Sequence, residues 1–135
     1  MTKRCRNCAA VIGPAGCPAS FPVIEIVPRK AAWFDPRCKY EEGGALEIVP
    51  ADIDPRIEHE LRALATRVHT LIGAAGATRT DFILDVEDRP WILEINTLPG
   101  MTSASLLPKA VAAAGWSPVD LVEALLEGVL GTGEE

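Results

Sequence analysis

The chain has 135 residues, which suits one domain, and 48% of them are hydrophobic, enough to form a core. Its formal net charge of -6 at pH 7 argues against nucleic acid or an anionic membrane surface as a general partner, because both would repel the chain. No apolar run approaches the roughly 20 residues that span a bilayer, and the first residues lack the apolar core of a signal peptide, so we expect a cytoplasmic protein.

The beginning of the chain shows no regular pattern. Residues 1–19 are rich in Gly, Pro and Cys and have no sustained period of 2 or 3.6, so we expect an irregular leader. Cys5 and Cys8 form a CxxC pair that could be half of a zinc site, but no second CxxC or HxxxH follows. Cys17 and Cys38 are poorly spaced to complete it, and reduced thiols are therefore the favoured interpretation.

Two short strands are expected next. Residues 21–27 and residues 45–49 are apolar runs, and each is followed by a proline that stops it. The loop between them contains the adjacent Lys39 and Tyr40, a basic and aromatic pair before a Gly-Gly turn.

A long amphipathic helix follows these strands. Asp54 is a good N-cap, Pro55 fits the first helical position, and apolar residues recur at helical spacing until Gly73. His59 and His69 lie on this helix without a partner motif nearby, so we expect both at the surface or at the boundary of the core.

Two shorter helices are predicted near the C-terminus. One starts near Ser105 and ends about Gly115, and the other opens at Ser117, before a tail over residues 132–135. The buried face of the last helix is expected to contain Leu121, Val122, Leu125, Leu126 and Val129. These elements predict an α+β fold, an antiparallel sheet with flanking helices packed on its apolar face.

Between the long helix and the two shorter ones, a predicted hairpin brings four polar groups together. Successive side chains of a strand alternate, so Arg79 and Asp81 of RTDFILDV share a face, as do Glu94 and Asn96 of WILEIN. A turn centred on residues 87 and 88 makes Asp81 face Glu94, whereas a turn one residue later makes it face Asn96. Both registers keep the four polar side chains on one face.

The opposite face of the hairpin is predicted to be apolar and to pack against helices. It would contain Phe82, Leu84, Val86, Trp91, Leu93 and Ile95. One side of the hairpin is therefore expected to be core and the other a site.

The polar face favours a divalent cation. Opposed carboxylates disfavour strand pairing by about 0.2 to 1 kcal/mol in exposed cases, and a cation would compensate. Two carboxylates and an amide oxygen are ligands that Mg²⁺ takes, so Asp81, Glu94 and Asn96 are candidate ligands of Mg²⁺ or Mn²⁺. The alternative is an exposed sheet face on which Arg79 simply pairs with Asp81 or Glu94.

The loop after the hairpin has the geometry of an anion site. The segment NTLPGMTSAS leads from a strand into a helix start, where free N–H groups and the helix dipole favour a carboxylate or phosphate. Ser103 or Ser105 can add a hydroxyl, and Gly100 would let a backbone N–H approach a reacting oxygen closely. The alternative is that Ser105 only caps its own helix. A metal and an anion pocket would be contiguous here, as an enzyme that handles a nucleotide phosphate and an acid requires.

Several segments, in unbroken order, resemble the C-terminal part of the D-alanine-D-alanine ligases, which belong to the ATP-grasp superfamily. They are FPVIEI, CKYEEGG, RTDFIL, LEINTLPGMTSASLLP and GWSPVDLVEALL, and they cover residues 20–131. The run EINTLPGMTSASLLP is the most specific of them. The resemblance implies a cytoplasmic ligase with ATP as co-substrate and magnesium as cofactor, which joins two D-alanine molecules for peptidoglycan, and so for the cell wall and cell shape. ATP phosphorylates the carboxylate of the first D-alanine, and the amine of the second attacks the acyl phosphate.

The resemblance also implies roles for residues of the hairpin. Asp81, Glu94 and Asn96 resemble the magnesium ligands that bridge the ATP phosphates. Arg79 is similar to the residue that steadies the tetrahedral intermediate, with the backbone N–H of Gly100 beside it.

Roles for three further residues follow from the same resemblance. Ser105 is similar to the serine that holds the carboxylate of the second D-alanine. Lys39 resembles the lysine that contacts phosphate, and Tyr40 the tyrosine that orders the lid over the site.

Ligases of this family also have an N-terminal domain that grips the first D-alanine and a central domain that forms the other jaw around ATP. Only the leader precedes FPVIEI, and it looks unlike the family, so we expect weak ATP binding and little ligase activity from this chain alone. A homodimer, or a second chain that supplies the missing domains, would be its partner. Two alternatives remain: a ligase that takes D-lactate or D-serine second, and a non-catalytic module that binds metal, nucleotide or a partner subunit.

Overall fold

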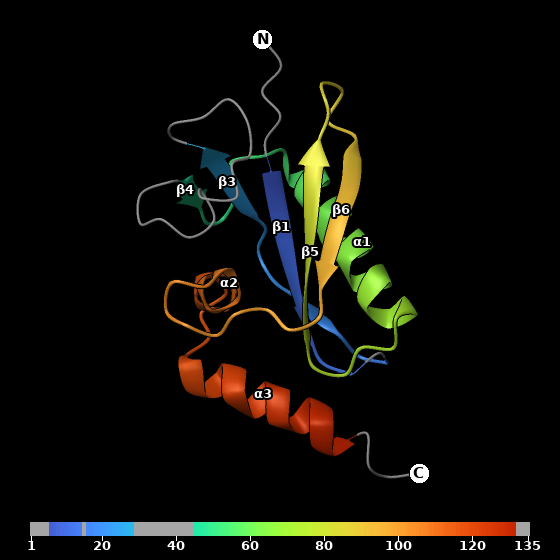
Figure 1. Ribbon diagram of the computed structural model, residues 1–135, viewed down its shortest axis with the longest axis vertical. Coiled ribbons are helices and arrows are strands. Elements are labelled where there is room, and N and C mark those ends of the chain that lie inside the picture. The colour runs from blue at the N-terminus through green and yellow to red at the C-terminus, as the bar shows by residue number, and fades with distance from the viewer. Residues whose placement is uncertain (1–5, 15, 29–44, 132–135) are drawn as a thin grey trace.

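Figure 1 shows the computed structural model, which describes residues 6–14, 16–28 and 45–131. The described strands form one antiparallel sheet in the order β4-β3-β1-β5-β6, and β2 pairs with β1. The strands are β1 (Arg6–Ile12), β2 (Ala19–Ser20), β3 (Ile24–Pro28), β4 (Ala45–Ile48), β5 (Ala77–Leu84) and β6 (Pro90–Asn96). The helices are α1 (Pro55–Leu71), α2 (Leu106–Ala113) and α3 (Pro118–Leu130). The predicted α+β class is confirmed.

The central strand of the sheet, β1, comes from the segment expected to be irregular. It pairs with β3 on one side and with β5 on the other, and all seven of its residues are buried. A strand covered on both faces has no alternation of apolar and polar residues, so the period-2 signal is missing. The prediction of an irregular leader over residues 1–19 is therefore wrong for β1 and for the short β2.

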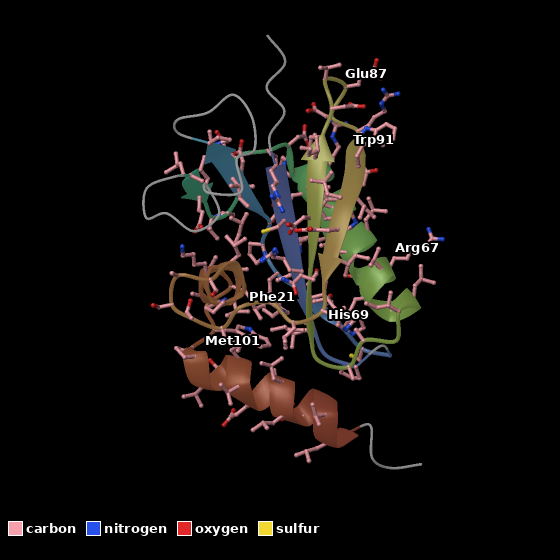
Figure 2. All side chains as sticks on the ribbon, viewed as in Figure 1. Phe21, Arg67, His69, Glu87, Trp91 and Met101 are labelled. Carbon is pink, nitrogen blue, oxygen red and sulfur yellow. The ribbon has the colours of Figure 1, made fainter. Side chains whose placement is uncertain are left out.

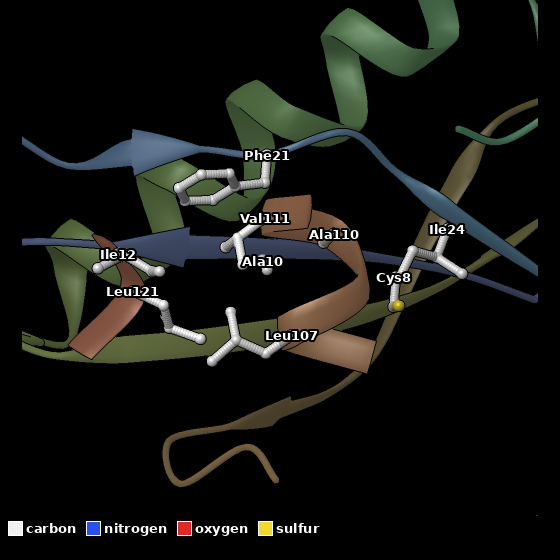
Figure 3. Packing of buried hydrophobic residues seen from close by; sticks show 9 residues of the cluster. All are labelled: Cys8, Ala10, Ile12, Phe21, Ile24, Leu107, Ala110, Val111 and Leu121. Carbon is white, nitrogen blue, oxygen red and sulfur yellow. The ribbon is translucent and has the colours of Figure 1, made fainter. Parts of the chain in front are cut away.

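Helices cover both faces of the sheet, rather than the single apolar face that was predicted (Figure 1). Leu61 and Ala65 of α1 pack with Phe82 and Leu84 of β5 on one face. A second cluster forms on the other face, where α2 and α3 lie (Figure 3). Its buried members are Cys8, Ala10, Ile12, Phe21, Ile24, Leu107, Ala110, Val111 and Leu121. The polar face of the hairpin thus shares its side of the sheet with a second core.

Helix α1 has the bounds that its local signals predict. The Asp54 side chain accepts a hydrogen bond from the backbone N–H of Arg56 at 2.8 Å, and Pro55 is the first helical residue. The helix ends at Leu71, and Gly73 follows with a φ of 68°.

His69, which was expected at the surface or the boundary of the core, is fully buried near the end of α1 (Figure 2). Its Nε2 contacts the carbonyl oxygen of Gly13 at 2.7 Å, so this nitrogen donates. Its Nδ1 lies 2.8 Å from the hydroxyl of Thr78. Both ring nitrogens have partners, and the histidine therefore joins α1 to the ends of β1 and β5.

The hairpin has the first of the two registers considered. Asp81 faces Glu94 and Arg79 faces Asn96, but Phe82 faces Ile92, so a bulge leaves one extra residue on β6. The bulge shifts Trp91 opposite Ile83, onto the polar side of the hairpin.

The bulge changes what the outer strand buries. Phe82 and Leu84 of β5 are buried as predicted, but Val86, Trp91, Leu93 and Ile95 are exposed. Three of these residues lie on β6, which is the edge strand of the sheet and has a neighbouring strand on one side only.

The last two helices are close to their predicted positions. Ser105 and Ser117 are the N-caps of α2 and α3. On α3, Leu121 is buried and Leu125 is partly buried. The expectation of a wider buried face is wrong, since three of its members are exposed: Val122, Leu126 and Val129. Within the described ranges, no helix has the length and apolarity to cross a membrane.

Candidate functional site

Three adjacent strands, β1, β5 and β6, bring the predicted polar residues together. Alternation and register place Arg79 and Asp81 of β5 on one face with Glu94 and Asn96 of β6. Arg6 of β1 pairs with Ile83, two residues beyond Asp81, so its side chain points to the same face. The candidate site therefore contains a second arginine in addition to the four predicted residues.

Both arginines donate hydrogen bonds to the Asp81 carboxylate. Arg79 Nε donates to Oδ1 of Asp81 at 2.8 Å, and Arg79 Nη2 lies 3.3 Å from Oδ2. Arg6 Nη2 donates to the same Oδ2 and also to Oε1 of Glu94, at 3.1 Å. One guanidinium nitrogen thus bridges two carboxylates that lie on different strands.

The members of this charge cluster differ in burial. The side chain of Asp81 is 1% exposed and that of Arg6 is 8% exposed, whereas that of Glu94 is 49% exposed. Burial opposes the charge of Arg79, but the hydrogen bond and the attraction from Asp81 outweigh it, and the pKa of Arg79 is raised. Burial, helped by the negative charge of Asp81, raises the pKa of the neighbouring Cys8 to about 12.

The oxygens expected to bind magnesium already accept hydrogen bonds. Both carboxylate oxygens of Asp81 and Oε1 of Glu94 accept from arginines, and Oδ1 of Asn96 accepts from the backbone N–H of Leu98 at 2.9 Å. The donor set in this arrangement does not fit Mg²⁺.

The loop after β6 is organised around Ser105. Its Oγ accepts from the backbone N–H of Thr102 at 3.2 Å and lies 2.8 Å from the Thr102 hydroxyl. Ser105 occupies the N-cap position of α2, but its side chain makes no cap hydrogen bond, so the alternative of simple helix capping is wrong. A Cβ at Gly100 would come within 2.6 Å of Ser105 Oγ, and glycine therefore permits this close approach.

Other expectations concern residues outside this cluster. Lys39 and Tyr40 lie outside the described residues, as do Cys5 and Cys38, and the roles of Lys39 and Tyr40 stay predictions. The other two thiols are free: that of Cys8 is buried and that of Cys17 is exposed.

Arg6 is the site residue that sequence reasoning missed. Its segment was interpreted as a leader, and its carboxylate partner Asp81 lies 75 residues further along the chain. The continuous apolar run CAAVI before Gly13 is a pattern of a strand buried on both faces, and it could have indicated β1.

The fold and the site are those of the ATP-grasp ligases, and the chain corresponds to the C-terminal part of such an enzyme. A crystal structure of D-alanine-D-alanine ligase from Bacillus anthracis, complexed with ATP, matches 96% of this chain with a TM-score of 0.75 and 25% identity. The sequence model of the family described as "D-ala D-ala ligase C-terminus" matches residues 4–127. The chain belongs to this family. Because the match begins at residue 4, the expectation that the segment before FPVIEI is unlike the family is wrong for β1.

Curated relatives of the chain point to the same family. The chain is 42% identical over 117 residues to D-alanine-D-alanine ligase of Bordetella pertussis, a match that covers 87% of this chain and 37% of the relative. It is 39% identical over 110 residues to the ligase of Synechococcus sp. (strain JA-2-3B'a(2-13)), which covers 82% of this chain and 34% of the relative. The matched part of the Bacillus anthracis structure is 39% of that chain. This chain thus spans about a third of the length of the curated relatives it matches.

Proposed function

We propose that this chain supplies the C-terminal part of an ATP-dependent ligase site that joins two D-alanine molecules for peptidoglycan synthesis. The observation that carries the proposal is the same-face arrangement of Arg79, Asp81, Glu94 and Asn96, from which the Ser105 loop leads directly into α2. A cytoplasmic location stays a prediction, as do the partners proposed above.

In this proposal Arg79 stabilises the reaction electrostatically, through its positive charge. Asp81 fixes its guanidinium through two hydrogen bonds, so the positive charge is oriented before substrate arrives. It would offset negative charge on the tetrahedral intermediate, and the backbone N–H of Gly100 would assist.

Ser105 is proposed to hold the carboxylate of the second D-alanine. Its hydroxyl is oriented by Thr102 and lies at the N-terminal end of α2, where the helix dipole favours a negative charge. With its carboxylate bound here, the second D-alanine would be held in place while its amine attacks the acyl phosphate.

The isolated chain is proposed to bind ATP weakly and to show little ligase activity, because most of the relatives' length has no counterpart in it. A magnesium requirement stays a prediction, and no step of this proposal depends on the ion. A titration of the purified chain with ATP, followed by calorimetry with and without magnesium, tests the proposal. Weak binding that saturates only at millimolar ATP is expected, and no heat of binding at that concentration would contradict it.

A second candidate function is a non-catalytic module that keeps the fold. The contact of Arg6 with both Asp81 and Glu94 favours it, because this contact satisfies the carboxylates without metal or nucleotide. Failure of ATP to bind in the calorimetric experiment would favour this module over the ligase.

A further inference from the structure

The strongest feature of the candidate site is a single nitrogen placed between two carboxylates. Arg6 Nη2 donates to Oδ2 of Asp81 and to Oε1 of Glu94, which lie directly opposite each other on β5 and β6. A cation shared by these two carboxylates would occupy the same position.

The four side chains that these ion pairs join carry equal numbers of positive and negative charges. Arg6 and Arg79 contribute two positive charges, and Asp81 and Glu94 contribute two negative charges, so the four side chains are neutral as a set. A divalent ion added to this set would leave a net charge of +2 in a site where Arg6 and Asp81 have almost no contact with water. If Arg6 carried no charge, the other three side chains would sum to -1, which favours a divalent cation.

The backbone also restricts Arg6. It lies on β1, which is paired on both sides, with Ile26 of β3 and Ile83 of β5 as its neighbours in register. Its side chain is 8% exposed. The guanidinium therefore belongs to a residue of the central strand, whose backbone is fixed by pairing on both sides.

From these contacts we propose that Arg6 is a built-in cation, which takes the place of a divalent metal between Asp81 and Glu94 and prevents metal binding there. The proposal goes beyond the ligase function and does not rest on it, because it concerns ion binding by this chain alone. It assigns to Arg6 control over whether this face of the sheet accepts a divalent ion.

The test is a Mn²⁺ titration of the purified full chain, monitored by the electron paramagnetic resonance signal of free Mn²⁺. The Arg6→Gln variant is expected to bind one Mn²⁺ at least about tenfold more tightly than the wild type, because a positive charge is removed beside two carboxylates. The Arg6→Lys variant keeps the charge and should behave like the wild type. An Arg6→Gln affinity equal to that of the wild type would overturn the proposal.

Two further variants check that the gain is local. Arg67→Gln makes the same change in net charge on α1, where Arg67 points away from the sheet, and it should show no gain (Figure 2). Adding Glu94→Gln to Arg6→Gln should return the affinity to the wild-type value. An equal gain in Arg67→Gln, or a gain that survives Glu94→Gln, would refute the local mechanism.

A measurement on the wild type keeps the proposal testable if Arg6→Gln does not fold. Bound Mn²⁺ broadens the NMR signals of nearby amides, and Phe82 follows Asp81 directly in β5. The proposal predicts that Mn²⁺ leaves the amide signal of Phe82 sharp at concentrations that broaden the exposed acidic turn at Glu87. Saturable broadening at Phe82 in the wild type would show that Arg6 does not exclude the ion.

Discussion

Gly128 of α3 lies against the backbone carbonyl of Ala75: a Cβ at position 128 would come within 2.2 Å of that oxygen. Glycine within a helix costs about 1 kcal/mol relative to alanine, so its presence in the last turn of α3 needs a reason. The close approach supplies it, because only a residue without a side chain lets α3 lie against the segment between α1 and β5.

Replacement of Gly128 by alanine should therefore destabilise the fold despite the better helix propensity of alanine. We expect the free energy of unfolding to fall by about 1–3 kcal/mol, the range for overpacking, in a urea titration followed by circular dichroism. Gly131→Ala is the control, since a Cβ at Gly131 meets nothing within 4 Å. If the two variants unfold at the same urea concentration, the close contact does not explain this glycine.

Cys8 and Cys17 should differ in reactivity. Cys8 is buried and its pKa is raised to about 12, so almost no thiolate is present at neutral pH, whereas Cys17 is exposed. Brief treatment of the native chain with a maleimide, followed by peptide mass mapping, should find Cys17 labelled and Cys8 unlabelled. Labelling of both thiols at similar rates would show that Cys8 is not protected.

The same shift in pKa makes stability depend on pH in alkaline solution. The folded state holds the Cys8 proton more tightly than the unfolded chain, in which the pKa is near 9.0, so its contribution is complete below 9.0 and declines as pH rises toward 12. The free energy of unfolding of the wild type should therefore fall more steeply over this range than that of Cys8→Ala. Parallel curves for the two proteins would refute the effect.

Asp85 organises the tip of the hairpin. Its carboxylate accepts from the indole N–H of Trp91 at 3.1 Å and from the backbone N–H groups of Glu87 and Arg89 at 2.9 and 3.0 Å. These hydrogen bonds, that of Trp91 foremost, lower its pKa, so the contacts should persist as pH falls through the ordinary value of 3.8 and be lost only below it.

The indole N–H resonance of Trp91 reports on this contact. We expect it to keep its chemical shift through pH 3.8 in the wild type and to move at neutral pH in Asp85→Ala. Glu87→Ala is the control, because its side chain makes an ion pair with Arg89 on the surface and accepts no hydrogen bond from the indole. A midpoint at 3.8 in the wild type would contradict the account.

His69 should contribute to stability through both ring nitrogens. His69→Leu fills the same space with an apolar side chain but leaves the carbonyl of Gly13 and the hydroxyl of Thr78 without their partner, at a cost of about 1–3 kcal/mol. His59→Ala, on the exposed surface of the same helix, should change the free energy of unfolding by less than about 0.5 kcal/mol. Equal effects of the two variants in a urea titration would refute a structural role of His69.

The sequence predicted the elements whose signals are local. Asp54, Pro55 and Gly73 mark the ends of α1 with neighbouring residues, and alternation in the two hairpin strands was enough to place Arg79, Asp81, Glu94 and Asn96 on one face. The bulge was not visible, because a one-residue shift depends on how β6 packs and leaves no mark in composition.

The parts that escaped prediction depend on distant contacts. β1 is buried on both faces and shows no alternation, so its place between β3 and β5 became clear only in the folded chain. The bridge from Arg6 to Asp81 and Glu94 followed from that placement. For this reason sequence reasoning found the two carboxylates but missed Arg6, which donates hydrogen bonds to both of them.

The most direct test of the proposed ligase function is D-alanine-dependent release of ADP from a chimera. In it, residues 4–131 of this chain follow the N-terminal part of the Bordetella pertussis ligase. The chimera should release ADP only when D-alanine is present, the isolated chain should release little, and Arg79→Ala in the chimera should lower the rate about 10²–10³-fold. A folded chimera that releases no ADP in the presence of D-alanine would contradict the account.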